Sequence, residues 1–206
     1  MIKLYGLKLS NYYSLVKAAL IEKELEFEEI KAPPSQEKES LARSPMGKMP
    51  SIEVDGQYLS ESFAIVNYLE KRTPTPALLP ADPMTAGKTL ELSCHIMLNV
   101  ELVARRCLYA ALFGGSVSDE AKASTREDLP RGLQAVNQLM TYGPYAIGDQ
   151  FTLADLYAYY SLGLAGTVYR KMFDANPLDD FPQMQALTSL LAERPSIARV
   201  TAESAS

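Results

Sequence analysis

Residues 44–62 read SPMGKMPSIEVDGQYLSES, and this stretch decides how the first part of the chain folds. The pair Asp55-Gly56 is the strongest short-range signal of a β-hairpin, because both residues tolerate the positive φ angles of a tight turn. Residues 51–54 alternate polar with apolar side chains before the pair, and residues 58–59 supply the returning strand after it. The stretch therefore predicts two antiparallel strands joined by a tight turn.

The dipeptide Met49-Pro50 stands immediately before this hairpin. Proline lacks a backbone N–H, so a proline at the start of a strand requires a sheet edge or a special peptide bond. We expect a cis bond here, which would turn the amide and carbonyl of Met49 outward, where they could pair in β fashion with a bound peptide. Proline statistics by themselves favour the alternative, a trans proline between loop and strand.

Glu61 and Ser62 begin the helix that follows the hairpin. Backbone amides at a helix N-terminus point outward and attract a carboxylate, and the Ser62 hydroxyl adds a further donor. Glu61 can accept a ligand ammonium, and the nearby Lys48 can meet a second carboxylate. Together with Met49, these residues are complementary to a short peptide with a free α-amino-acid end. A simple helix cap is the alternative explanation for Glu61 and Ser62.

The residues that precede this stretch complete an α/β domain. Residues 2–6 alternate as a short strand, residues 12–24 carry apolar side chains at helical spacing, and residues 27–30 return to an extended pattern. Residues 32–44 contain prolines around a charged stretch, which predicts a loop with at most one short helical turn. With the hairpin and its helix, the order is β-α-β followed by β-β-α. That order, with a cis-proline, matches a thioredoxin-like fold.

Prolines at positions 74, 76, 80 and 83 stiffen the chain and exclude helix, so they mark a domain boundary. We predict a first domain over residues 1–76, a proline-rich linker over residues 77–83 and a second domain over residues 84–206. Nearly all of the second domain has helical periodicity, which predicts an all-α bundle. Its expected helices cover residues 84–112, 118–141, 152–168 and 178–193.

One helix start in this bundle is well specified by its sequence, GDQFTLADL at residues 148–156. Thr152 and Asp155 have the spacing of a capping box, and Phe151 can pack onto Leu156 as a hydrophobic staple. Losing such a cap typically costs about 1 kcal/mol. We therefore interpret the motif as a folding element rather than a catalytic one.

Charge and composition exclude several classes of function. The chain has 206 residues and a net charge of −5, and no cluster of Lys or Arg, which argues against a nucleic-acid partner. No window is apolar enough to span a membrane, and the first residues lack the pattern of an export signal, so we expect a cytoplasmic protein with no membrane partner.

Cys94, Cys107 and the single histidine, His95, do not make a zinc site, so no metal is expected.

Two motifs together resemble the cytosolic glutathione S-transferase family. The pattern S-P-M-G-K-M-P-S-I-x-x-D-G-x-x-L-x-E-S-x-A-I-x-x-Y-L resembles the family's glutathione-site motif, and GDQFTLADL resembles its bundle motif. The resemblance implies that Met49, on a backbone shaped by Pro50, pairs with the cysteinyl backbone of glutathione. It implies further that Glu61 and Ser62 hold the γ-glutamyl end and that Lys48 lies near a carboxylate.

A transferase of this kind must lower the pKa of the glutathione thiol, because at the free-cysteine value of about 8.5 only a few per cent is thiolate at pH 7. One hydroxyl and a helix N-terminus suffice for a shift of about two units. Ser10 is our first candidate for this hydroxyl, since it precedes the first helix and since KLYGLKLS resembles the plant-type and theta-like classes with an activating serine. The alternative is that Ser10 only caps the helix. Tyr5, which corresponds loosely to the activating tyrosine of other classes, is the runner-up.

The loop after the first strand narrows the chemistry further. It contains no cysteine, so glutathione mixed-disulfide chemistry is not expected, and the double-serine-cysteine signature of maleylacetoacetate isomerases is absent. The chain is identified as a bacterial-type member that is serine-activated or unclassified. The resemblance implies glutathione as a substrate with no cofactor, and a homodimer for which the helix over residues 84–112 is a plausible interface.

The second substrate is expected to be a small hydrophobic electrophile, and an apolar wall could hold it, formed by Leu7, Leu9, Tyr12, Tyr109 and Phe113. Aromatic residues at helical spacing more often belong to a core, which is the alternative for the two residues of the bundle. The leading hypothesis is transfer of glutathione to that electrophile, as in detoxification. The alternative is a glutathione-transferase-like partner-binding or regulatory protein that binds glutathione with little transferase activity.

Overall fold

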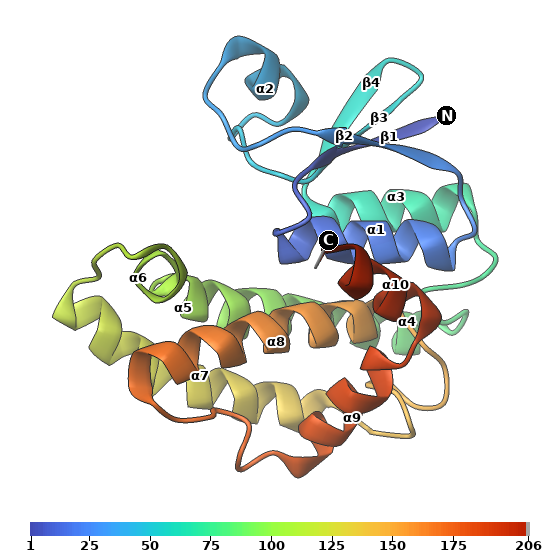
Figure 1. Ribbon diagram of the computed structural model, residues 1–206. Coiled ribbons are helices and arrows are strands. Elements are labelled where there is room, and N and C mark those ends of the chain that lie inside the picture. Colours follow the sequence, from blue (N-terminus) through green and yellow to red (C-terminus); the bar gives the residue numbers. More distant parts are fainter. Residues whose placement is uncertain (205–206) are drawn as a thin grey trace. The chain divides into compact units, whose positions relative to one another are not determined.

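The computed structural model describes residues 1–204, which form two compact units. Unit 1 combines Met1–Leu78 with the described residues from Glu193 onward, and unit 2 is Leu79–Ala192. Unit 1 contains the strands and four helices, whereas the remaining helices belong to unit 2 (Figure 1).

Unit 1 is built on a four-stranded mixed sheet in the order β2-β1-β3-β4. β1 pairs with β2 in parallel and with β3 antiparallel, and β3 and β4 form the predicted hairpin. The elements of this unit are β1 (Ile2–Gly6), α1 (Asn11–Glu22), β2 (Phe27–Lys31), α2 (Lys38–Arg43), β3 (Ser51–Val54), β4 (Gln57–Ser60), α3 (Ser62–Arg72) and α10 (Pro195–Ser204). The predicted α/β thioredoxin-like fold class is confirmed, including the cis bond between Met49 and Pro50.

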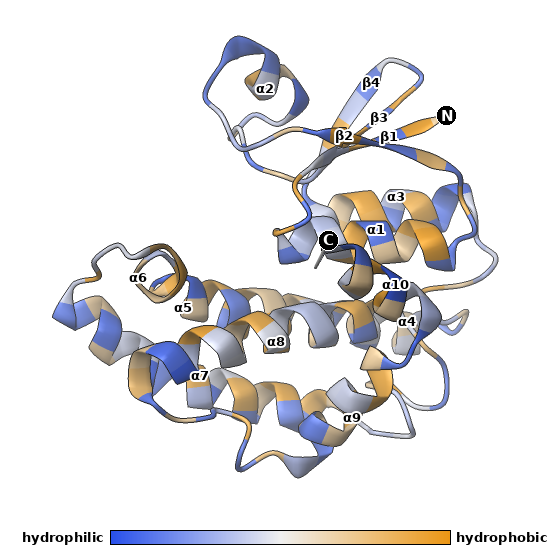
Figure 2. Cartoon of the chain, viewed as in Figure 1, coloured by the Kyte–Doolittle hydropathy of each residue, from blue (hydrophilic) through white to orange (hydrophobic). Residues whose placement is uncertain are grey.

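The core of unit 1 lies where α1 and α3 pack against the sheet (Figure 1). The alternation predicted for β1 is confirmed, because Ile2 and Leu4 are buried whereas Lys3 and Tyr5 are partly exposed. Apolar residues recur along both helices in Figure 2. Burial of these faces against the sheet stabilises the unit whose loops and helix starts carry the candidate site residues.

The C-terminal helix α10 also belongs to unit 1 and lies beside α1 (Figure 1). Two nitrogens of the Arg194 guanidinium donate to the Glu22 carboxylate at 2.7 and 2.8 Å, and the Ser196 hydroxyl donates to the same carboxylate at 2.5 Å. Residues 193–204, which the sequence places in the helical domain over residues 84–206, therefore pack in the same compact unit as residues 1–78. Glu22 and Arg194 are 172 residues apart, so no local pattern could reveal their pairing.

Unit 2 is helical, as predicted for the bundle. Its elements are α4 (Pro83–His95), η1 (Ile96–Glu101), α5 (Leu102–Arg105), α6 (Leu108–Phe113), α7 (Asp119–Leu139), α8 (Leu153–Phe173) and α9 (Pro182–Ala192). The carboxylate of Asp155 accepts hydrogen bonds from the N–H of Thr152 at 2.8 Å and the N–H of Ala146 at 2.8 Å, so the start of α8 is capped as expected. Within the described residues, no helix combines the length and apolarity needed to cross a lipid bilayer.

The single helix expected over residues 84–112 is interrupted. α4 continues into the π-helical segment η1, and the short helices α5 and α6 follow. Gly132 of α7 lies so close to η1 that a Cβ atom there would be 2.0 Å from the carbonyl oxygen of Asn99. This close packing coincides with the π-helical turn, and hydrophobic periodicity alone carries no sign of it.

Candidate functional site

The loop before β3 carries Lys48, Met49 and Pro50. Gly47 adopts a φ of +61°, and a Cβ atom at this position would lie 2.0 Å from the carbonyl oxygen of Ser35, so only glycine fits without displacing the neighbouring loop. The N–H of Ser35 in turn donates to the carbonyl of Gly47 at 3.0 Å. These contacts fix the loop, and with it the positions of the three candidate residues that follow.

Met49 lies just beyond the end of the β1–β3 ladder, whose last paired residue on β3 is Ser51. Its side chain is half-buried, Pro50 is buried and Lys48 is exposed. Among residues 1–204, no ion pair involves Lys48. The loop thus presents a cation without an ion-pair partner among the described residues, next to the bend at Met49 that leads into β3.

The start of α3 brings Glu61 and Ser62 together at a helix N-terminus, as the sequence predicts. Ser62 is the first helical residue and is 6% exposed, whereas the Glu61 side chain is exposed and makes no capping hydrogen bond. Glu61 has φ 71° and ψ 116°, a backbone conformation that residues other than glycine rarely adopt and that costs of order 1–3 kcal/mol. A simple helix cap does not account for this conformation, and strained residues of this kind cluster at ligand sites.

Ser10 is the N-cap residue of α1. Its hydroxyl oxygen accepts the N–H of Tyr13 at 3.4 Å, which is at the long end of the hydrogen-bond range. Ser10 therefore caps the helix, which is the role that the sequence analysis gave as the alternative. A serine hydroxyl also has a proton to donate, and within residues 1–204 the proton of Ser10 has no acceptor. Capping and donation to a ligand are compatible at this position.

The hydroxyl of Tyr5 is committed to a carboxylate. It donates to Glu53 of β3 at 2.5 Å, and burial together with this hydrogen bond raises the pKa of Tyr5 well above its usual range. A phenol that already donates to a carboxylate has no proton left for a ligand thiolate. Tyr5 is thus committed within the sheet, and the role of Ser10 in thiol activation stays a prediction.

A pocket in unit 1 brings Tyr5, Lys48 and Met49 to one place, lined also by Arg43 of α2. The Arg43 guanidinium lies 5.1 Å above the centre of the Tyr5 ring and binds Glu39 at 2.9 Å. Sequence reasoning missed Arg43, because residues 32–44 have the composition of a loop and give no face on which to place it. Because α2 is helical and Arg43 contacts the Tyr5 ring, the Arg43 guanidinium lines the same pocket as Lys48.

The residues proposed for the second substrate are divided between the units. Leu7, Leu9 and Tyr12 belong to unit 1, and Tyr109 and Phe113 belong to α6 of unit 2. Leu9, Tyr109 and Phe113 are 70%, 66% and 56% exposed, so the two aromatic residues are not part of a core. Their rings stack with centroids 6.2 Å apart. The apolar wall itself stays a prediction.

Comparison with known proteins gives the same family for both parts of the chain. Residues 4–77 match the model of the glutathione S-transferase N-terminal domain, and residues 106–204 match that of the C-terminal domain. A glutathione S-transferase of Pseudomonas putida is 42% identical over 203 residues, which cover 98% of this chain and 92% of that protein. A maleylacetoacetate isomerase of Pseudomonas aeruginosa is 28% identical over 158 residues, covering 76% of this chain and 72% of that protein.

The fold has close counterparts among solved structures. Glutathione transferase F7 of Populus trichocarpa superimposes with a TM-score of 0.82 over 100% of both chains at 23% sequence identity. That likeness concerns the fold, whereas the Pseudomonas putida relative and the two domain matches cover sequence over nearly the whole length. The chain therefore belongs to the glutathione S-transferase family.

Proposed function

We propose that the protein, a glutathione transferase by family, joins the thiolate of glutathione to a small hydrophobic electrophile. The observation that carries the proposal is the start of α3, where Glu61 is held in a strained conformation next to the amides of a helix N-terminus. The Glu61 carboxylate, which can accept the ammonium of a ligand, thus lies beside backbone amides that can bind the carboxylate of the same ligand. This pair of groups matches the α-amino-acid end of glutathione.

The remaining binding residues extend the match along the peptide. We assign the backbone of Met49 to the cysteinyl residue of glutathione, since it lies two residues before the first paired residue of β3 and lines the same pocket as Tyr5 and Lys48. Pro50 shapes this backbone, and Lys48, whose charge has no ion-pair partner within residues 1–204, faces a carboxylate. Arg43 lines the same pocket as Lys48 and adds positive charge there.

Ser10 is the group that we assign to the chemical step. Its hydroxyl donates a hydrogen bond to the glutathione sulfur and lowers the pKa of the thiol, which releases its proton to solvent. The thiolate then forms a carbon–sulfur bond to the electrophilic carbon of the second substrate. In a substitution, the bond from that carbon to the leaving group breaks and the leaving group departs with the electron pair. In an addition, the displaced electron pair stays on the substrate and takes a proton from solvent. A shift of two units corresponds to about 2.7 kcal/mol, which is in the range of one hydrogen bond to a charged group.

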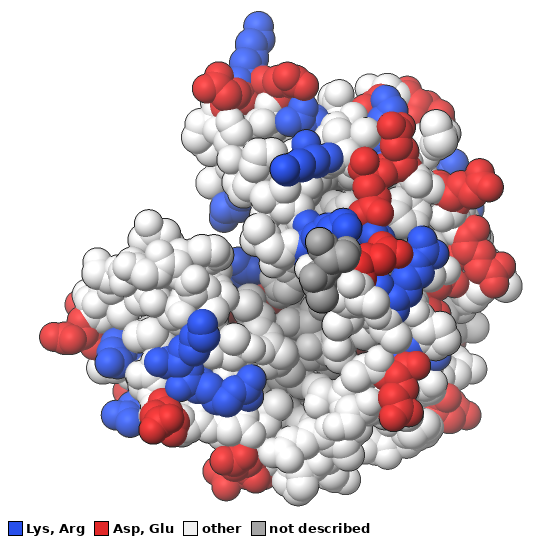
Figure 3. Space-filling view, in the orientation of Figure 1, with Lys and Arg blue, Asp and Glu red and all other residues white. Residues whose placement is uncertain are grey.

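Several finer points belong to the same proposal. The electrophile contacts the apolar side chains of Leu7, Leu9 and Tyr12 in unit 1, and the role is detoxification in the cytoplasm by a homodimer without a cofactor. The absence of nucleic acid and membrane as partners is supported by a net charge of −5. On the face drawn in Figure 3, basic side chains are interspersed with acidic ones rather than gathered in a stripe.

Two other activities compete with this proposal. Some relatives are named maleylacetoacetate isomerases, but the loop around Ser10 lacks cysteine and their double-serine-cysteine signature. A regulatory protein that binds glutathione without transferring it remains the second candidate, because fold alone does not determine activity. Retention on immobilised glutathione followed by turnover of an aryl halide separates it from the transferase.

The sharpest test compares two helix caps. Ser10→Ala removes the proposed thiol ligand, whereas Ser118→Ala removes an equivalent cap at the start of α7, where the hydroxyl accepts the N–H of Ala121 at 3.2 Å. Each loss of a cap costs about 1 kcal/mol of stability. We expect Ser10→Ala to lower aryl-halide turnover by about tenfold or more while glutathione affinity persists, and Ser118→Ala to leave turnover unchanged. Equal turnover in the two variants would contradict the role of Ser10.

A further inference from the structure

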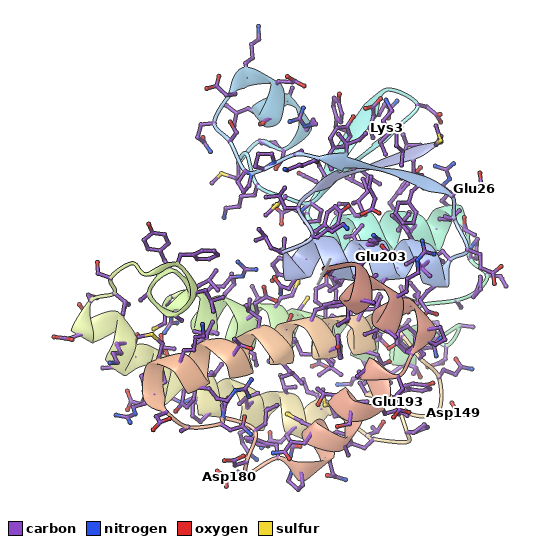
Figure 4. The ribbon with its side chains drawn as sticks, in the orientation of Figure 1. Lys3, Glu26, Asp149, Asp180, Glu193 and Glu203 are labelled. Carbon is purple, nitrogen blue, oxygen red and sulfur yellow. The ribbon has the colours of Figure 1, made fainter. Side chains whose placement is uncertain are left out.

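The helix α10 is fixed to α1 near both of its ends. Near its start, Arg194 binds Glu22 in the last turn of α1. Near its end, the Glu203 carboxylate binds the ammonium of Lys17 and, at 2.8 Å, the guanidinium of Arg199. The helices thus run antiparallel, and the last turn of α10 lies over the first half of α1, where Figure 4 labels Glu203.

Lys17 is the centre of the second attachment. Its side chain is only 2% exposed, and it also binds Glu29 of β2 at 2.6 Å. A buried ammonium between two carboxylates is costly to displace, because removing one partner leaves an uncompensated charge. Glu203 is therefore held in one place relative to α1 and the sheet.

From that fixed position, α10 reaches the loop that carries Ser10. The ammonium of Lys8 donates to the main-chain carbonyl of Glu203 at 2.9 Å, although the two residues are 195 positions apart. The carbonyl of Lys8 accepts from the Ser14 hydroxyl at 3.4 Å, and the N–H of Ser10 donates to the carbonyl of Leu7 at 3.0 Å. The loop over residues 7–10 is thus bound to α1 on one side and to α10 on the other.

We propose that Lys8 and Glu203 are positioning residues for the Ser10 hydroxyl, through which the C-terminal helix sets the geometry of thiol activation. The proposal rests on the assignment of Ser10 to the chemical step. A displacement of about 1 Å at a catalytic group can cost on the order of a hundredfold in rate. An attachment two residues before Ser10 is close enough in the chain to control such a displacement.

The contact made by Lys8 is suited to a positioning role rather than to global stability. The hydrogen bond from Lys8 to Glu203 is exposed, and exposed charged contacts contribute little to the free energy of unfolding. Its loss should therefore release the loop while the fold persists. The buried Lys17 contact, by contrast, serves both the stability of the unit and the placement of Glu203.

The test uses the whole chain with the variants Lys8→Met and Lys8→Arg. Lys88→Met is the matched control, because Lys88 is an exposed lysine of unit 2 that binds Glu91 at 2.7 Å. The rate of amide hydrogen exchange over residues 7–14 measures how often the loop opens. The values of kcat and KM for glutathione measure how well the site works. In Lys8→Met we expect exchange to be about fivefold faster and kcat about fivefold lower, with KM within about twofold. Lys8→Arg restores the donor and should return both to the wild-type values, and Lys88→Met should change neither.

Unchanged exchange of the loop in Lys8→Met overturns the proposal, whatever the activity of the protein. Faster exchange with unchanged kcat overturns it as well, because the loop would then move without affecting Ser10. If the wild-type protein binds glutathione without turning over an electrophile, the ultraviolet absorbance of the bound thiolate replaces kcat as the readout. A wild-type protein that does not bind glutathione would refute the proposed function instead, which the binding assay detects separately.

Discussion

The hydroxyl of Tyr5 donates a 2.5 Å hydrogen bond to the carboxylate of Glu53, across the pair formed by β1 and β3. Glu53 also binds Lys3 at 3.2 Å, and the hydrogen bond from Tyr5 and then the one from Lys3 lower the pKa of the Glu53 carboxyl. A tyrosine in this arrangement keeps its proton to high pH. The relationship separates the two candidates for thiol activation, because the Ser10 proton has no such acceptor within the described part of the chain.

Tyr5→Phe should therefore leave catalysis intact. We expect kcat with an aryl halide to stay within about twofold of the wild-type value, because the hydroxyl that is removed serves Glu53 and not the substrate. Steady-state kinetics with glutathione as the varied substrate provide the measurement. A large fall in kcat for Tyr5→Phe, together with an unaffected Ser10→Ala variant, would transfer the role to Tyr5.

Glu61→Gln should weaken glutathione binding by about fivefold to tenfold, because it removes the charge that accepts the ligand ammonium while it keeps the side-chain size. Isothermal titration provides the affinity, and Glu26→Gln, an exposed carboxylate of the same unit, is the control. A glutathione analogue without the α-amino group sharpens the assignment. It should bind the wild-type protein and Glu61→Gln equally well, and an additional loss in the variant would mean that Glu61 contacts another part of the ligand.

Lys23→Met should destabilise unit 1 strongly. The ammonium of Lys23 is fully buried, binds Glu70, and donates to the carbonyls of Thr73 at 2.8 Å and Pro76 at 2.6 Å. Its removal leaves the Glu70 charge unpaired, which typically costs about 3–5 kcal/mol. Urea unfolding followed by circular dichroism measures the change.

The double variant Lys23→Met with Glu70→Leu is the control for that prediction. It removes both charges and should recover part of the lost stability, because an apolar pair of similar volume avoids the unpaired carboxylate. If the double variant were less stable than Lys23→Met, the hydrogen bond that Glu70 accepts from the N–H of Leu78 at 2.9 Å would outweigh the charge pairing.

Acid should loosen the attachment of α10 through Glu203. Hydrogen bonds from Arg199 and then Lys17 lower the pKa of Glu203 from 4.5 to about 2. A carboxyl whose pKa is lower in the folded state contributes stability above its unfolded value, and that contribution is lost as the pH falls from 4.5 towards 2. Unfolding free energies measured across this window should fall less steeply for Glu203→Gln than for the wild-type chain. Parallel pH profiles for the two proteins would refute the contribution of Glu203.

Some of this architecture follows from short patterns in the sequence. The hairpin at Asp55-Gly56 and the capping box at Thr152 and Asp155 each depend on a few adjacent residues, and the structure contains both. Local backbone preferences determine such features, so a single sequence reveals them. The positions of Glu61 and Ser62 at the start of a helix follow for the same reason.

Other features depend on residues far apart in the chain. The placement of α10 with the first domain rests on Glu22 with Arg194 and on Lys17 with Glu203, and the latter pair is separated by 186 positions. The pairing of Tyr5 with Glu53 and the contact of Arg43 with Tyr5 likewise form only when the sheet and α2 are assembled. The sequence by itself determined the two-part fold and the chemistry of the ligand. Tertiary structure decided that the Tyr5 hydroxyl is committed to Glu53 and that α10 lies against α1, because burial and charge pairing arise only when distant segments meet.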